Sequence, residues 1–185
     1  MKRLFDLVLA LAGTLVFALP LILVALLVKC SSRGPVLYWS DRVGRDNQLF
    51  SMPKFRSMRV DTPAVATHLL SDPQQYLTPV GALLRKTSLD ELPQLWCVAT
   101  GSMSMVGPRP VLPTELETLY GNRQDCYLRS KPGLTGLWQV SGRSNITGDD
   151  RVDLDCTYVH NWSFLGDLGV LIRTVPAVLC GRGSH

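Results

Sequence analysis

The residues best suited to chemistry are two adjacent carboxylates, Asp90 and Glu91, at the expected start of a short apolar helix. Ser88 and Glu91 have the spacing of a capping box, which would make Asp90 the second helical residue. Unpaired backbone N–H groups and the helix dipole favour an anion there, so Asp90 is predicted to be ionised at neutral pH. An ionised carboxylate can attack without a separate base. The alternative is that both acids only cap the helix, whose first turn Pro93 would strain.

Three arginines stand in settings that suit the binding of an anion. Arg85 lies at the end of a predicted helix, Arg109 is enclosed by two prolines, and Arg143 follows a glycine. The glycines of residues 131–140 permit close backbone approach to a ligand, and Lys54 to Met58 places two cations around an aromatic ring. Any one of these features is usually structural. Together they indicate an anionic ligand held by guanidinium groups.

A second acidic pair, Asp153 and Asp155, forms a D-x-D motif in a polar stretch, residues 149–160, that is predicted to be helical. D-x-D is the metal motif of many nucleotide-sugar glycosyltransferases. Three letters also occur often by chance, and the structural interpretation is a surface face of the helix. Both interpretations stay open at the level of sequence.

An apolar segment stands at the start of the chain, before the elements that must position these residues. Its 22 residues, from Leu7 to Val28, carry no charge. A straight helix of that length would reach ~33 Å, enough to cross a bilayer. Pro20 should break the helix at Ala18 to Pro20, and basic residues flank both ends of the segment. These features predict a re-entrant element with both ends on the cytoplasmic side. The alternative is a kinked span with the N-terminus outside.

The charge distribution favours a membrane surface as partner. The formal net charge of the 185-residue chain is +4, and the first 60 residues hold nine Lys or Arg against three Asp. No nucleic-acid-binding motif accompanies this excess, so nucleic acid is not expected to bind. Five cysteines show no C-x-x-C spacing, which predicts reduced thiols facing the cytoplasm.

The rest of the chain predicts a small, mostly helical α/β (α+β) catalytic domain over residues 34–185, attached to a membrane element over residues 1–33. A β-hairpin is expected over residues 35–55 and a loop over residues 61–78. A helix should open at Thr78 and Pro79, with another over residues 113–129. Gly101 should end the Asp90 helix before a strand at residues 103–106. Residues 164–179 read as a buried or membrane-surface helix.

Five motifs resemble the bacterial sugar transferase family, the monotopic phosphoglycosyl transferases, in that family's order and over nearly the whole chain. They are Lys54-Phe-Arg-Ser-Met, Leu89-Asp-Glu-Leu-Pro-Gln-Leu, Gly107-Pro-Arg-Pro, Pro132-Gly-Leu-Thr-Gly with Gln139-Val140, and Gly142-Arg143. The resemblance implies a Mg²⁺-dependent transfer of a sugar 1-phosphate from a UDP-sugar to undecaprenyl phosphate. UMP would be released, on the cytoplasmic face of the bacterial inner membrane, at the first membrane step of polysaccharide or glycoconjugate assembly.

The resemblance also assigns residues. Asp90 and Glu91 match the catalytic pair, with Asp90 as nucleophile and metal ligand, and the phosphate-binding arginines match Arg85, Arg109 and Arg143. Further candidates for substrate binding are Lys54, Arg56, Pro110, Thr135 and Gln139. The family breaks its membrane helix at a Ser-Pro pair, whereas this chain has a leucine before Pro20, so the break rests on the proline.

Two other functions remain open from the sequence. A conventional glycosyltransferase using the D-x-D motif would release UDP rather than UMP, and a membrane-bound scaffold would catalyse nothing. The sequence determines neither the sugar, nor the glycan pathway, nor the role of Glu91, and it leaves a homo-oligomer open.

Overall fold

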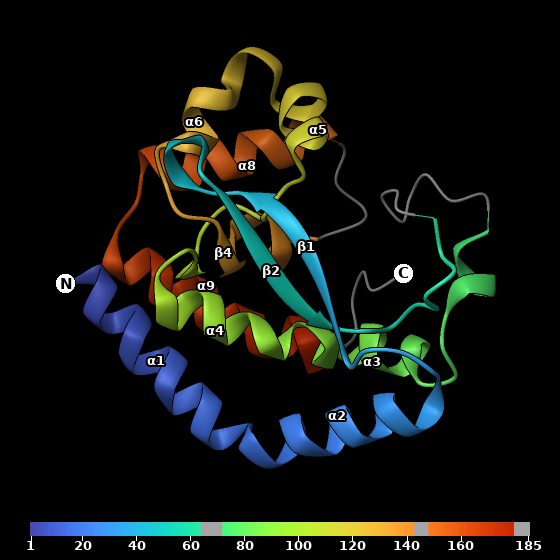
Figure 1. Ribbon diagram of the computed structural model, residues 1–185. Coiled ribbons are helices and arrows are strands. Elements are labelled where there is room, and N and C mark those ends of the chain that lie inside the picture. Colours follow the sequence, from blue (N-terminus) through green and yellow to red (C-terminus); the bar gives the residue numbers. More distant parts are fainter. Residues whose placement is uncertain (64–71, 143–147, 180–185) are drawn as a thin grey trace.

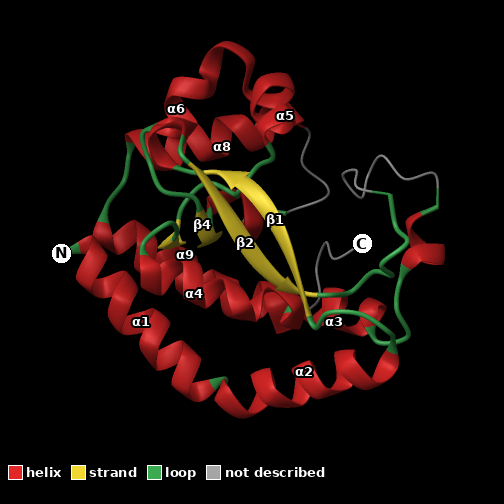
Figure 2. Ribbon diagram, in the orientation of Figure 1, coloured by secondary structure: helices red, strands yellow, loops and turns green. Residues whose placement is uncertain are grey.

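The computed structural model describes residues 1–63, 72–142 and 148–179. Its described part is mostly helical, with two small sheets (Figure 2). In Figure 1, α1 and α2 form an arc along one side of the domain, the β1–β2 hairpin crosses the middle, and α5, α6 and α8 lie at the opposite end. This arrangement confirms the predicted mixture of helices and a hairpin.

The apolar N-terminal segment forms two helices, α1 (Lys2–Val16) and α2 (Ala18–Ser31), bent by 61°. The break lies at Phe17, just before the predicted turn at Ala18 to Pro20. Pro20 is the third residue of α2 and has no N–H to donate to the carbonyl of Val16, so the bonds of α1 cannot continue through it. Among the described residues, no single helix has the length and apolar composition to cross a membrane, whereas this bent pair satisfies both criteria together.

The predicted hairpin is confirmed. Strands β1 (Leu37–Val43) and β2 (Leu49–Phe55) pair antiparallel, with Ser40 opposite Met52. Asp46 and Asn47 in the connecting turn have positive φ angles of 55° and 61°, which these short polar residues tolerate. A second sheet pairs β3 (Ser104–Val106) parallel to β4 (Gly133–Thr135).

Several helices follow the predicted pattern. Gly101, at a φ of 96°, ends α4 (Leu95–Thr100), and the polar and apolar stretches near the C-terminus form α8 (Gly148–His160) and α9 (Phe164–Leu179). A short helix, α7 (Leu137–Val140), follows β4. Of the predicted loop over residues 61–78, residues 64–71 lie outside the described part, and Pro73–Tyr76 form a 3-10 turn.

Two predicted helices differ. Helix α3 (Gly81–Thr87) begins later than predicted, because Thr78 is buried and its hydroxyl donates to the Ser57 carbonyl instead of capping a helix. The continuous helix predicted over residues 113–129 is divided into α5 (Pro113–Glu115), a π-helical turn, a 3-10 turn and α6 (Gln124–Leu128). Gly121 adopts a φ of 47° between these segments, a conformation that an α-helix does not contain.

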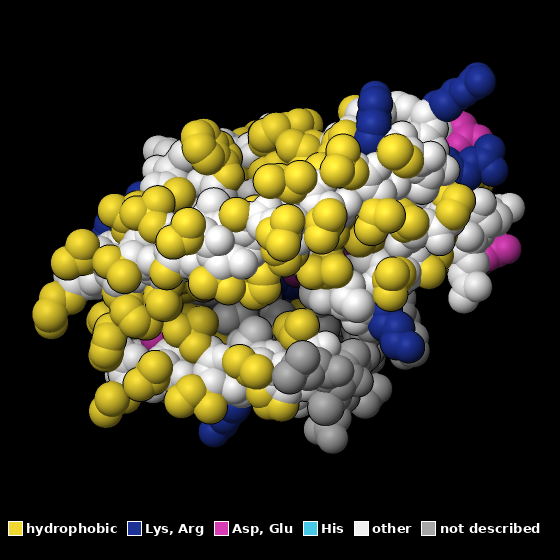
Figure 3. Space-filling view, turned by 90° about the horizontal axis from the view of Figure 1, so that it is seen from below, with side chains coloured by type: hydrophobic (Ala, Val, Ile, Leu, Met, Phe, Trp, Pro, Cys, Tyr) yellow, Lys and Arg dark blue, Asp and Glu magenta, His cyan; other side chains and the backbone are white. Residues whose placement is uncertain are grey.

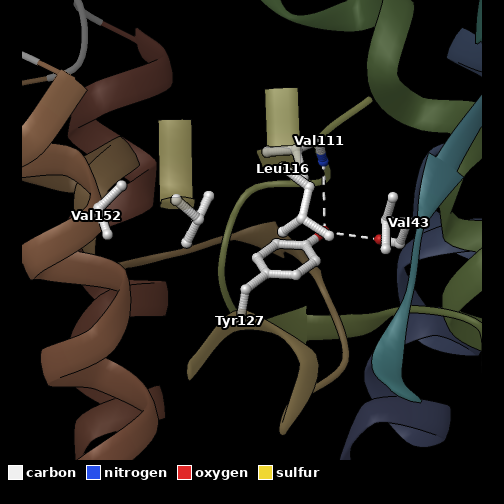
Figure 4. Close-up of a cluster of buried hydrophobic side chains, with 6 residues drawn as sticks. Val43, Val111, Leu116, Tyr127 and Val152 are labelled. Atoms are coloured by element: carbon white, nitrogen blue, oxygen red, sulfur yellow. Dashed lines mark hydrogen bonds between the residues drawn. The ribbon is translucent and has the colours of Figure 1, made fainter. Parts of the chain in front are cut away.

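A cluster of buried side chains joins the hairpin to α6 and α8 (Figure 4). Tyr127 lies at its centre, and its hydroxyl donates to the Val43 carbonyl at 2.7 Å and accepts from the Val111 N–H at 3.4 Å. Cys126 and Cys156 form a disulfide between the same two helices. The prediction of reduced thiols is therefore wrong for this pair, because the fold brings together two cysteines that are 30 residues apart in the sequence.

Both ends of the α1–α2 pair are bonded to the rest of the domain. Lys2 donates to the buried carboxylate of Asp167 at 2.6 Å, and Asp6 accepts from the Ser104 hydroxyl at 2.9 Å. At the other end, the Arg56 guanidinium donates to the carbonyls of residues 32 and 33 at 2.8 and 2.6 Å. The two ends are thus attached to one folded unit.

Candidate active site

The acidic pair lies in a 3-10 turn, Leu89–Gln94, rather than at the start of an α-helix. The predicted capping box is absent: Ser88 has a left-handed backbone (φ 56°), and its side chain makes no cap hydrogen bond. The Glu91 N–H donates instead to the backbone carbonyl of Ser88 at 3.2 Å. A 3-10 helix has three residues per turn, so adjacent side chains diverge by ~120°. Asp90 and Glu91 consequently face different surroundings.

Asp90 is only 7 % exposed. Burial, and next the negative charge of Glu91, raise the pKa of Asp90 to about 6, while Lys54 and Arg85 oppose this shift. The sequence predicted an ordinary acid stabilised by a helix end, so the direction of the pKa shift is a correction. A carboxyl with a pKa of about 6 is still mostly ionised at pH 7.

Two cations belong to the surroundings of the acidic pair. Lys54, on β2, forms an ion pair with Glu91 at 2.8 Å, and both side chains are partly buried. Arg85, at the end of α3, donates to the Ser57 hydroxyl at 3.0 Å, and burial lowers the pKa of its guanidinium while the nearby Asp90 charge opposes that shift. The turn therefore carries Glu91, which is paired with Lys54, and the buried Asp90, which lies near Lys54 and Arg85.

A cavity adjoins the turn. It is lined by residues from the hairpin, the acidic turn, the loop after β3, strand β4 and helix α7: Arg42, Met52, Lys54, Glu91, Gln94, Arg109, Pro110, Gly133, Leu134 and Gln139. Five predicted site residues are thus brought together, namely Lys54, Glu91, Arg109, Pro110 and Gln139. Three cations and one carboxylate line the cavity, which favours an anionic ligand.

Arg109 is fixed by its neighbours. Its guanidinium carbon lies 5.5 Å from the ring centre of Trp138, and the guanidinium carbon of Arg151 lies 4.9 Å from the same ring. The chain turns into this loop at Gly107, where a Cβ atom would collide with the carbonyl of Lys131. Trp138 and Arg151 had no predicted role, because only the fold brings α7 and α8 beside the Arg109 loop.

Other predicted residues lie elsewhere. Arg56 is bonded to the end of α2, and the buried Thr135 hydroxyl pairs with that of Thr174 at 2.8 Å. Arg143 lies outside the described residues. Conversely, Arg42 and Gln94 line the cavity without having been predicted. Gln94 belongs to the same motif as Asp90, and its three-residue separation from Glu91 is the signal that could have identified it in a 3-10 turn.

The two acids of the D-x-D motif have separate partners. Asp153 is exposed and pairs with Arg123, as the surface interpretation predicted. Asp155 is only 1 % exposed and accepts a hydrogen bond from the Tyr120 hydroxyl at 2.7 Å, so that interpretation is wrong for this residue. Within the described residues, no group of three His, Cys, Asp or Glu side chains is placed to hold a metal ion.

The burial of Asp155 predicts a specific pH dependence of stability. Burial raises the pKa of Asp155 from 3.8 to about 6, although Tyr120 and Arg151 oppose the shift. Between these values the native state binds the additional proton, so this carboxyl destabilises the fold progressively as pH rises from about 4 to about 6. Asp155→Asn should remove this dependence and, at pH 7, stabilise the protein by up to about 3 kcal/mol.

Thermal unfolding of both proteins between pH 4 and pH 7 measures this difference. A variant less stable than wild type at pH 7 would contradict the prediction, because attraction to the arginines would then outweigh the cost of burial.

A buried acid, a neighbouring acid paired with lysine and a cavity lined by cations together suit a site for an anionic, phosphate-bearing ligand. The family model for bacterial sugar transferases matches residues 1–181. The chain belongs to this family and is a sugar-phosphate transferase.

Three curated relatives are similar to this chain over its full length. It is 44% identical over 201 residues to "Exopolysaccharide production protein ExoY" of Rhizobium meliloti (100% of this chain, 88% of the relative). It is 42% identical over 202 residues to "Undecaprenyl-phosphate galactose phosphotransferase" of Salmonella typhimurium (100% and 42%). It is also 40% identical over 194 residues to "UDP-glucose:undecaprenyl-phosphate glucose-1-phosphate transferase" of Caulobacter vibrioides (100% and 72%).

Proposed function

We propose that this enzyme transfers a sugar 1-phosphate from a UDP-sugar to undecaprenyl phosphate, with release of UMP and a covalent intermediate on Asp90. The names of the Salmonella and Caulobacter relatives support the acceptor and the class of donor. The observation that carries the proposal is the position of Asp90, buried near Lys54 and Arg85 and next in the chain to a residue that lines the cation-lined cavity. A carboxylate in such surroundings can approach an anionic phosphoryl group.

The reaction has two steps. A carboxylate oxygen of Asp90 attacks the sugar-bearing phosphorus, the bond from this phosphorus to the UMP oxygen breaks, and UMP leaves with that electron pair. A phosphate oxygen of the lipid then attacks the phosphorus of the acyl phosphate, which breaks the bond to Asp90 and restores its carboxylate. Lys54, Arg85 and Arg109 offset the negative charge that the reacting groups bring together.

Neither step requires a proton transfer, so the reaction does not need Glu91 as a general acid or base. Its ion pair with Lys54 supports a role in orienting that lysine.

The donor set around the turn is compatible with Mg²⁺. This ion commonly uses one or two carboxylates together with substrate phosphates and water, so a single acid suffices on the protein side. Asp90 would hold the ion, and when bound it would neutralise phosphate oxygens.

We also propose that α1 and α2 enter the inner membrane and return to the cytoplasmic side. Apolar side chains gather over the face shown in Figure 3, and exposed leucines, valines and isoleucines recur along both helices and α9. The bonds of Lys2 to Asp167 and of Arg56 to the end of α2 support the return, because one folded domain lies on one side of a bilayer. This topology is consistent with the basic residues at both ends.

A cysteine placed before Met1, in a background carrying both Cys30→Ser and Cys180→Ser, tests the topology in intact cells. A membrane-impermeant maleimide should label it only after permeabilisation, as it should label Gln48→Cys in the hairpin turn. Labelling of the N-terminal cysteine from outside, with Gln48→Cys still protected, would indicate a single span.

A panel of UDP-sugars, each incubated with purified enzyme and undecaprenyl phosphate, tests the reaction itself. At least one sugar should give UMP and a lipid-linked phosphosugar. Release of UDP would instead indicate a conventional glycosyltransferase, and absence of turnover across the panel would favour a scaffold. The productive sugar would also identify the substrate.

A further inference from the structure

Gln94 contains a buried hydrogen-bond donor that meets no acceptor within residues 1–63, 72–142 and 148–179. The residue is only 3 % exposed, it lines the cavity, and its Nε2 atom has no hydrogen-bond partner among the described residues. An unpaired buried amide destabilises a protein, so such groups are uncommon unless another function requires them. A glutamine in this condition points to a ligand that supplies the missing acceptor.

The 3-10 geometry explains why Gln94 faces the cavity. Residues three apart lie on the same side of such a turn, and Gln94 follows Glu91 by three. Both residues line the cavity, whereas Asp90, one position before Glu91, occupies the adjacent direction. The donor therefore belongs to the same short 3-10 turn as the proposed nucleophile.

The charge of the cavity indicates which acceptor this donor meets. Lys54, Arg42 and Arg109 line it together with a single carboxylate, Glu91. The surplus of cations suits phosphate oxygens, and a neutral amide adds a directed N–H without changing the charge. Lysine and arginine attract such an anion from any direction, whereas the amide acts only where its N–H points.

We propose that Gln94 is a catalytic residue that donates a hydrogen bond from Nε2 to a non-bridging oxygen of the phosphoryl group attacked by Asp90. The inference rests on the proposed function. Charge accumulates on these oxygens as the phosphorus is attacked, and a preorganised donor stabilises the transition state more than the bound substrate. Gln94 thus combines a stability cost in the free enzyme with a gain in the rate of phosphoryl transfer.

This combination gives Gln94→Met opposite effects on rate and stability. Methionine has a similar length but no donor, so kcat should fall about 10²- to 10³-fold with little change in KM, and to the same extent for every sugar that the wild type accepts. The melting temperature should stay equal or rise, because the unpaired amide is gone. Gln48→Met, which changes an exposed glutamine in the hairpin turn, serves as control and should leave both quantities unchanged.

Steady-state kinetics and thermal unfolding of the three proteins separate the outcomes. An unchanged kcat in Gln94→Met overturns the inference. A fall in both kcat and melting temperature also overturns it, since the amide is then structural. A loss of kcat restricted to one sugar overturns it as well, because the amide would then contact the sugar and not the phosphoryl group. Gln94→Asn, which withdraws the amide by one methylene group, should likewise lose rate. Absence of UMP release by the wild type would instead reject the proposed function.

Discussion

Replacement of Asp90 by asparagine is expected to abolish turnover almost completely. The amide has the size of the carboxylate but is a poor nucleophile, so the variant cannot form an acyl phosphate. The loss should appear in kcat and should exceed that of any other substitution in the turn. Release of UMP, measured with and without undecaprenyl phosphate, should stay at the background level in both cases.

Glu91→Gln provides the matched control, because it makes the same chemical change one residue later. This variant loses the ion pair with Lys54 but retains the proposed nucleophile, so it should turn over slowly and still accumulate the adduct. Equal and complete loss of adduct in both variants would contradict the division of roles. Substantial activity of Asp90→Asn would exclude Asp90 as the nucleophile.

Arg109→Lys should also lose much of the activity, although it preserves the positive charge. Arg109 lies over the ring of Trp138, and its planar guanidinium can present two parallel donors to phosphate oxygens. Lysine has a compact ammonium group that cannot make a two-pronged contact. We expect a loss of about 10²-fold or more in kcat/KM, measured by UMP release.

Arg123→Lys is the control for this substitution. Arg123 pairs with the exposed Asp149 and Asp153 of α8 and is not among the residues that line the cavity. Exposed ion pairs contribute little to stability, so its activity and melting temperature should stay near those of the wild type. Near-normal turnover of Arg109→Lys would restrict Arg109 to supporting its loop.

The elements with strong local signals were predictable from the sequence. The hairpin has apolar runs on either side of a polar turn, and Gly101 marks the end of α4, as predicted. The break in the N-terminal segment, at Phe17, lies within three residues of Pro20. It was predictable because a proline disrupts the preceding helical turn in any tertiary context. These features depend on neighbours close in the chain.

What the sequence did not reveal depends on contacts between distant segments. The capping box failed because Ser88 adopts a left-handed backbone and Glu91 pairs with Lys54, 37 residues earlier. Asp155 looked like a surface acid, yet Tyr120 from another segment buries and binds it. The position of Arg56 at the end of α2, rather than in the cavity, likewise follows from tertiary packing that no local pattern encodes.

The most direct test of a covalent mechanism is the mass of the intact wild-type enzyme after incubation with its UDP-sugar and Mg²⁺, without a lipid acceptor. We predict that the protein gains the mass of one phosphosugar, in step with a stoichiometric burst of UMP, and that undecaprenyl phosphate then discharges the adduct. The absence of both adduct and burst, with UMP appearing only when both substrates are present, would contradict the mechanism. Direct attack by the lipid phosphate would then replace it, and Asp90 would serve as a magnesium ligand without acting as a nucleophile.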